Sequence, residues 1–220
     1  MSTSSTTRGQ RIGIWVIAAL MALGTIGSLV AALLSNANAG KDQERLQSMI
    51  KAFDKEVQAH NNVLSKKYFT TFAPYRERVS TFDSNITELV KEDIVVGEGK
   101  EITEDSTFWA YYIGWLDDGT VFDSSFDADK SNINGATELK GPFEVVQNGA
   151  IQGWLQGMIG AKIGGVRELT IPADLAYGDQ ASGDIPANST LRFVIMTIDN
   201  PNQPQPSADL LKLSERTGGY

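Results

Sequence analysis

The 220-residue sequence contains no cysteine and only one histidine, His60. Without cysteine, disulfide bonds, thiolate zinc sites and cysteine nucleophiles are excluded. One histidine alone does not favour a histidine-based metal site or a Ser-His-Asp triad. Basic side chains are in deficit, with 19 Lys and Arg against 27 Asp and Glu. Nucleic acid is therefore not an expected partner, because phosphate binding needs clustered Lys and Arg.

Charge is absent from residues 12–34, an apolar run close to the N-terminus. As a helix this run is about 35 Å long at 1.5 Å per residue, enough to cross a hydrocarbon core of about 30 Å. It also exceeds the roughly 7–15 apolar residues of a signal peptide. The sequence therefore predicts a transmembrane helix that places residues 12–34 in the lipid bilayer.

The flanks of this run predict its orientation. Arg8 and Arg11 precede it, which favours a cytoplasmic tail at residues 1–11 and an extracytoplasmic remainder. The expected location is the cell membrane, with a single pass. An A-x-A pattern just after the run also matches a cleavage site. A secreted protein released by cleavage near Ala39 is therefore the alternative.

Residues 35–86 form a predicted helical linker. Within it, residues 41–68 contain no Pro or Gly, and apolar side chains recur alternately four and three positions apart. The seam consists of Leu46, Ile50, Phe53, Val57, His60 and Leu64. This spacing predicts an amphipathic helix, which Pro74 should end. Packing on the neighbouring domain and self-association through residues 46–64 both remain open.

From residue 87 onward, short β-rich runs separated by Gly, Asp and Asn replace the helical pattern. Residues 107–115 and 190–198 are typical of strands, and the Asp-Asp-Gly at 117–119 indicates a hairpin turn. A short helix is expected at 153–158. The pattern predicts an α+β domain with an antiparallel sheet and one short helix. The Pro- and Gln-rich tail, residues 200–220, is predicted to be mobile.

A family resemblance begins with YIGWLDDGTVFDSS at residues 112–125. This stretch resembles the Y-x-G-x-L-x-D-G-x-x-F-D-S-S signature of FKBP-type peptidyl-prolyl cis-trans isomerases. Further blocks follow in the family's order: Pro142-Phe143, IQGW at 151–154, IPADLAYG at 171–178 and IPANSTLRF at 185–193. The resemblance covers residues 87–199. It implies an FKBP-like, twisted five-stranded antiparallel sheet wrapped around one short helix.

The resemblance also implies a ligand pocket between that sheet and helix. Trp154 would be the floor on which the substrate proline ring rests. The implied aromatic walls are Tyr112, Phe122, Phe143 and Phe193. Asp123 and Tyr177 would form a polar pair that contacts the substrate. Ala150 and Ile151 would line the pocket, with the Ile151 backbone amide bonded to the substrate, and Ile185 would lie at the rim. No cofactor and no metal are implied.

Catalysis in such a pocket would act on the barrier to rotation about an X-Pro bond, about 18–20 kcal/mol. The twisted amide is less polar than the planar one, so a dry aromatic pocket favours it without any nucleophile or base. The implied substrates are proline-containing segments of unfolded or nascent secreted proteins. Macrolides such as rapamycin are implied ligands. A chaperone or binding module with little turnover is the alternative function.

Two departures from compact family members lie near the implied pocket. Residues 126–141 form a longer loop, which we expect to border the pocket mouth and alter access. Asp184 precedes Ile185, where an apolar or small residue is usual in the family. We expect this acid to make the rim more selective and to weaken macrolide binding.

Overall fold

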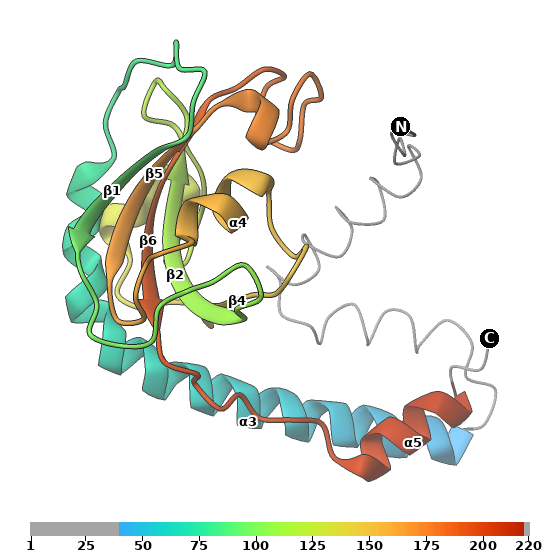
Figure 1. Cartoon of the computed structure of the whole chain (residues 1–220). Helices are drawn as coiled ribbons and strands as arrows, with labels where there is room; N and C mark the ends of the chain where they lie inside the picture. The colour runs from blue at the N-terminus through green and yellow to red at the C-terminus, as the bar shows by residue number, and fades with distance from the viewer. Residues whose placement is uncertain (1–39, 218–220) are drawn as a thin grey trace. The chain divides into compact units, whose positions relative to one another are not determined.

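The computed structural model describes residues 40–217, so positions 1–39 and 218–220 lie outside the described part (Figure 1). The predicted cytoplasmic tail, the membrane helix and the cleavage site near Ala39 all fall in the N-terminal stretch that is not described. Between residues 40 and 217, no helix is both long enough and apolar enough to cross a bilayer. The described chain divides into two compact units, Asn61–Pro201 and residues 40–60 with 202–217.

A six-stranded antiparallel sheet forms the centre of the unit Asn61–Pro201 (Figure 1). Its strands are β1 (Val90–Val95), β2 (Phe108–Trp115), β3 (Val121–Ser124), β4 (Phe143–Val145), β5 (Val166–Ile171) and β6 (Leu191–Ile198). The strand order is β1-β5-β6-β2-β3, and every neighbouring pair is antiparallel. β4 also pairs with β2, so the sheet has five strand positions and six strands.

The resemblance implied five strands, and the sixth arises because the edge strand is interrupted. β3 lies opposite residues 113–115 of β2, and β4 lies opposite residues 108–110. Both occupy the edge of β2 that faces away from β6. The chain leaves this edge after Ser124 and returns at Phe143. The long inserted loop, residues 126–141, thus splits one expected strand into two short ones.

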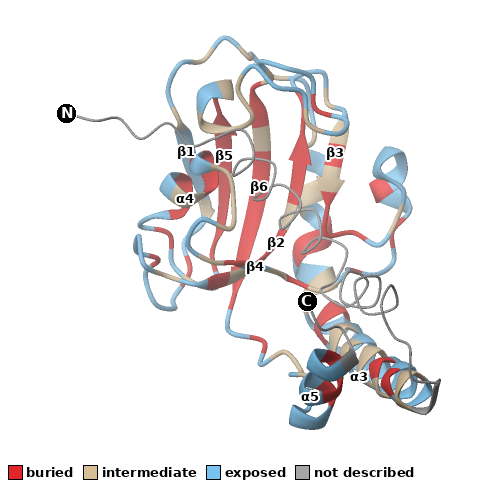
Figure 2. Ribbon diagram, turned by 90° about the vertical axis from the view of Figure 1, so that its right-hand side faces the viewer, coloured by how far each residue is buried: buried red, intermediate tan, exposed pale blue. Residues whose placement is uncertain are grey.

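The central strands are buried on both faces, and β2 and β6 are accordingly nearly continuous apolar runs, while β5 also buries Arg167, Glu168 and Thr170. Figure 2 shows β2, β5 and β6 as mostly buried. Successive side chains of a strand point to opposite faces. Even-numbered β2 residues such as Ala110 face the helix α4 (Gln152–Met158), while odd-numbered residues such as Tyr111 face the end of α3 (Gly40–Phe72). The unit therefore has two apolar layers, one on each face of the sheet.

The helix predicted for residues 41–68 is confirmed, and α3 runs four residues further, to Phe72. The chain continues as a 3-10 helix, η1 (Ala73–Arg78), with proline in its first turn. Phe72 is fully buried, and its ring stacks on that of Phe126 at 5.4 Å. Partly buried linker residues join the same layer, namely Phe69, Tyr75, Val79 and Phe82. The compact unit accordingly starts at Asn61 and not at residue 87.

The inserted loop, residues 126–141, is bonded to residues 65–76, which precede the sheet in the chain. The loop contains the 3-10 helix η2 (Lys130–Gly135). The Arg76 guanidinium donates hydrogen bonds to three of its carbonyl oxygens, those of Ile133, Asn134 and Ala136, at 3.0–3.2 Å. The Leu139 amide donates to the Ser65 hydroxyl oxygen at 2.8 Å. The insertion is therefore a packed part of the unit, which its polar sequence does not indicate.

In the second unit, the tail differs from its prediction. The sequence predicts a mobile tail at residues 200–220, whereas Ala208–Thr217 form the helix α5. Leu210 and Leu213, three positions apart, are buried against Leu46 and Ile50 of α3. Burial of this apolar pair explains the helix, because so short a helix is marginal alone. Two positions of the predicted self-association seam are thus covered within the chain.

Candidate active site

α4 is a seven-residue helix that lies very close to β5. A Cβ atom at Gly153 would come within 2.2 Å of the Ile171 side chain, and one at Gly157 within 2.5 Å of Leu169. Glycine is therefore required at both positions, one helical turn apart, for this approach. Trp154 follows the first glycine and is almost completely buried, with 3% of its surface exposed.

Trp154 is the centre of an aromatic cluster. Its ring meets those of Tyr112, Phe143 and Phe193 edge-on, with centroids 5.2, 5.9 and 5.3 Å away. Phe122 joins the cluster through Phe193, at 5.4 Å. Edge-to-face geometry at such distances is favourable for aromatic pairs. The structure thus brings together all five predicted aromatic residues from α4, β2, β3, β4 and β6.

The polar residues of the predicted site meet at one edge of this cluster. The Tyr112 hydroxyl donates a hydrogen bond of 2.5 Å to Asp123 Oδ2. The other oxygen of Asp123 accepts from the Ser124 amide at 2.8 Å. Burial, followed by the Asp123 charge, raises the pKa of Tyr112 well above its ordinary value, and the same two causes raise the pKa of Tyr177. Asp123 therefore bonds the Tyr112 hydroxyl, a residue that the resemblance implies only as an aromatic wall.

The remaining predicted residues also belong to this side of the sheet. Ala150 and Ile151 are half-buried against the core that contains Trp154, and Ile185 is buried within it. Ile151 immediately precedes α4, and its carbonyl oxygen accepts from the Trp154 amide at 3.0 Å. Among residues 40–217, no protein acceptor binds the Ile151 amide, which is the group expected to bond the substrate.

Comparisons with known proteins agree with this arrangement. The family model of the FKBP-type peptidyl-prolyl cis-trans isomerase matches residues 98–198. A probable FK506-binding protein of Corynebacterium glutamicum is 38% identical over 109 residues, which are 49% of this chain and 83% of that protein. An FK506-binding protein of Neisseria meningitidis serogroup A is 40% identical over 108 residues, 49% of this chain and 91% of that protein. The chain belongs to the FKBP-type peptidyl-prolyl cis-trans isomerase family.

A longer similarity extends beyond the isomerase domain. The FKBP-type peptidyl-prolyl cis-trans isomerase FkpA of Escherichia coli is 30% identical over 167 residues, which are 76% of this chain and 56% of that protein. Because the family model matches only residues 98–198, this similarity includes residues outside the isomerase domain. The sequence-based identification of the family and of its isomerase activity is confirmed.

The two departures from compact FKBP-type isomerases contact each other at the rim. Lys130 of the insertion forms an ion pair of 2.9 Å with Asp184. Both side chains are more than half exposed, so the pair stabilises the rim by only about 0–1 kcal/mol. The buried side chains of the insertion, including Phe126 and Ile133, pack on the opposite face of the sheet from Trp154. Lys130 thus connects the insertion to the predicted rim through its ion pair with Asp184.

Isomerisation at this site should be independent of pH between about 6 and 8. Tyr112 and Tyr177 have pKa values raised above the ordinary value of about 10, so both hydroxyls stay protonated throughout this range. His60 belongs to residues 40–60, outside the unit that contains Trp154. Rates of peptide isomerisation measured across the range test this expectation. A bell-shaped profile with a midpoint near neutrality would instead indicate acid-base catalysis.

Proposed function

We propose that this FKBP-type isomerase assists the folding of extracytoplasmic proteins by twisting X-Pro bonds against the aromatic cluster around Trp154. The observation that supports this proposal is the cluster itself, in which three aromatic rings meet one almost fully buried indole edge-on. FKBP-type proteins bind proline-containing segments and macrolides, so the proline ring is the expected occupant next to Trp154.

The chemistry of this site is stabilisation of the twisted amide. Rotation about the X-Pro bond removes amide resonance and with it part of the bond's dipole. Aromatic side chains replace water around the amide, which raises the energy of the planar state relative to the twisted one. In our proposal, the Ile151 amide binds a substrate carbonyl and holds the chain while the bond rotates. Only interactions that are stronger in the transition state than in the ground state accelerate the rotation.

Asp123 has a specific part in this scheme. Its carboxylate accepts from the Tyr112 hydroxyl and so fixes the ring of Tyr112 against Trp154. The same carboxylate places a negative charge beside Tyr177. We propose that Tyr177 donates a hydrogen bond to a substrate carbonyl oxygen, since its raised pKa keeps the hydroxyl protonated.

We further propose that residues 12–34 anchor the protein in the cell membrane, with the isomerase domain on the outer face. The supporting observation is the uncharged run preceded by Arg8 and Arg11. The clients are then secreted proteins that fold after they cross the membrane. Cleavage near Ala39 would give a secreted isomerase with the same clients.

The native protein should be found intact in carbonate-washed membranes. An apolar helix of about 35 Å resists extraction that releases peripheral proteins. N-terminal sequencing of the native protein distinguishes the anchored form from the cleaved form. Protease added to spheroplasts tests the orientation. A mature chain that begins at Gly40 would rule out the anchor, and protection of the isomerase domain would contradict the proposed orientation.

A further inference from the structure

The C-terminal end of α4 is held by two cationic side chains from the neighbouring strands. Arg167 of β5 donates to the carbonyl oxygens of Gly157 and Ile159, at 2.8 and 3.0 Å. Lys91 of β1 donates to the Gln156 carbonyl oxygen at 2.7 Å. The last carbonyls of a helix have no partner within the helix, and positive charge there is favourable. These bonds therefore fix the end of the helix that carries Trp154.

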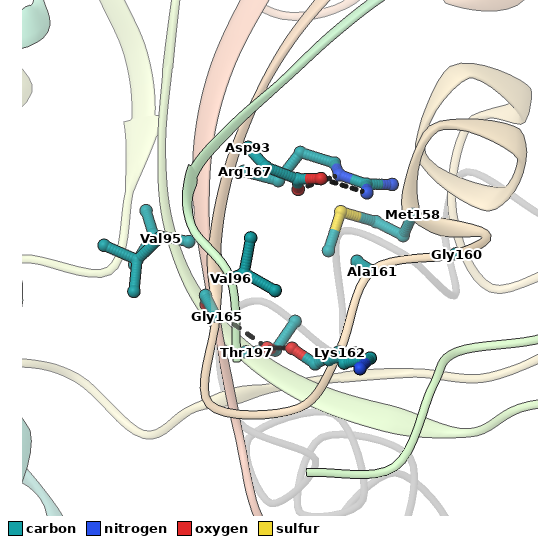
Figure 3. A pocket seen from close by; sticks show the side chains of 11 residues that line it. Asp93, Val95, Val96, Met158, Gly160, Ala161, Lys162, Gly165, Arg167 and Thr197 are labelled. Carbon is teal, nitrogen blue, oxygen red and sulfur yellow. Dashed lines mark hydrogen bonds and ion pairs between the residues drawn. The ribbon is translucent and has the colours of Figure 1, made fainter. Parts of the chain in front are cut away.

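Arg167 is itself fixed by a second set of bonds. It is 6% exposed. Its Nε and Nη2 atoms donate to the two carboxylate oxygens of Asp93 on β1, at 2.7 and 2.9 Å (Figure 3). This bidentate pair restrains the plane of the guanidinium group. Nη1 then has a defined direction, toward the end of α4.

A small cavity remains beside the C-terminal end of α4. It has a volume of about 40 Å³ and lies where α4 ends and the chain continues toward β5, lined by Asp93, Met158, Ala161, Arg167 and Thr197 among others. Figure 3 shows Met158 and the Arg167–Asp93 pair on the same side of this space. Toward both ends of the helix, Gly153 and Gly157 bring the backbone close to the Ile171 and Leu169 side chains. The bonds from Arg167 and Lys91 thus add directed polar restraints to the apolar packing at the C-terminal end.

We infer that Arg167 is a positioning residue for isomerisation, which sets the orientation of Trp154 by fixing α4 to strands β1 and β5. Its guanidinium donates hydrogen bonds to four acceptors, two carboxylate oxygens and two carbonyl oxygens. A lysine ammonium has the same charge but lacks the planar fork, so it cannot reproduce this geometry. The edge strand β1 lies far from Trp154 in the sequence, yet through Asp93 it supports the active site. This inference rests on the proposed role of Trp154.

The test compares Arg167→Lys with Arg192→Lys in the full chain, in detergent. Arg192 is a matched control, because it lies on β6, is partly buried and bonds Thr170 and Glu168, without a bond to α4. We expect Arg167→Lys to lower kcat/KM by about tenfold, since small displacements of a positioning group have effects of this order. We expect Arg192→Lys to stay within twofold of the wild type.

A spectroscopic measurement separates positioning from a general loss of stability. The indole N–H signal of Trp154, assigned by its loss in Trp154→Phe, should shift or broaden in Arg167→Lys. The signals of Trp109 and Trp115 should stay in place. Asp93→Asn, which keeps the arginine but weakens its restraint, should give a smaller change of the same kind and remains informative if Arg167→Lys fails to fold.

Two outcomes would overturn the inference. One is a wild-type rate and an unmoved Trp154 signal in both Arg167→Lys and Asp93→Asn. The other is a lowered unfolding midpoint without any change in rate or signal, which would make Arg167 purely structural. If substitution of Trp154 itself leaves the rate unchanged, the proposed function fails instead, so the two failures are distinguishable.

Discussion

Trp154→Leu should lower kcat/KM for isomerisation of an Ala-Leu-Pro-Phe peptide by roughly 30-fold, which corresponds to about 2 kcal/mol of lost transition-state stabilisation. Trp154 contacts three other aromatic rings edge-on and is the proposed surface for the proline ring. Leucine retains apolar character but not the flat surface or the volume that excludes water from the bond. Phe122→Ala should reduce the rate in the same direction, because Phe122 supports Phe193.

The control for this experiment is Trp109→Leu. Trp109 lies on β2 but belongs to the apolar layer on the opposite face of the sheet. Both substitutions remove a tryptophan from the same unit, so unfolding in urea shows whether each variant stays folded under assay conditions. We expect Trp109→Leu to keep the wild-type rate.

Full rates in both Trp154→Leu and Phe122→Ala would show that the assigned site is wrong. The same assay also separates an enzyme from a binding module. A wild-type chain that binds the peptide or rapamycin but does not accelerate isomerisation would support the chaperone alternative.

Arg76→Ala should lower the free energy of unfolding by about 3 kcal/mol. Hydrogen bonds to charged groups contribute roughly 1.5–3 kcal/mol, and a guanidinium over an aromatic ring adds about 0.5–2 kcal/mol. Arg76 donates to three carbonyl oxygens of the insertion. Its guanidinium also lies 5.0 and 5.6 Å from the ring centroids of Phe126 and Phe69. This loss is a large fraction of the 5–15 kcal/mol typical of a domain.

Hydrogen exchange would locate the effect of Arg76→Ala. Amides of residues 130–140 should exchange faster in the variant, while exchange of those of β2 and β6 should be accelerated only as far as the global stability falls. Lys66→Ala is the matched control, because Lys66 is exposed on α3, the helix that directly precedes the 3-10 helix η1 of Arg76. Unchanged protection of residues 130–140 would show that the insertion does not depend on Arg76.

The isomerase family and the FKBP-like antiparallel sheet with a short helix were predictable from residues 87–199. The signature at residues 112–125 contains Tyr112, Phe122 and Asp123 within a single hairpin, so their closeness follows from local structure. Trp154 and Phe193 lie far from this hairpin in sequence. Their place in the cluster was predictable only because the order of the blocks identified a known fold.

Other features depend on contacts that no local pattern indicates. The Arg76 bonds to the insertion join residues 57–60 positions apart, and the Arg167–Asp93 pair joins residues 74 positions apart. The sequence predicted a linker where the compact unit already begins at Asn61, because an amphipathic seam shows that a helix packs but not against what. In the same way, the polar loop at residues 126–141 gave no sign of its anchors.

By itself, the sequence determined the family and its isomerase activity, because the blocks between residues 112 and 193 follow the order of the FKBP-type signature. It also determined the helical character of residues 41–68 and the place near Pro74 where that helix ends. Only the tertiary structure decided which face of the sheet the insertion covers, that Lys130 meets Asp184, and that Arg167 holds the helix of Trp154. Periodicity in a sequence shows which face of a helix or strand packs, but not which segment covers that face. The register of β1 against β5 and the covering of both faces of the sheet arise only when distant segments pack together.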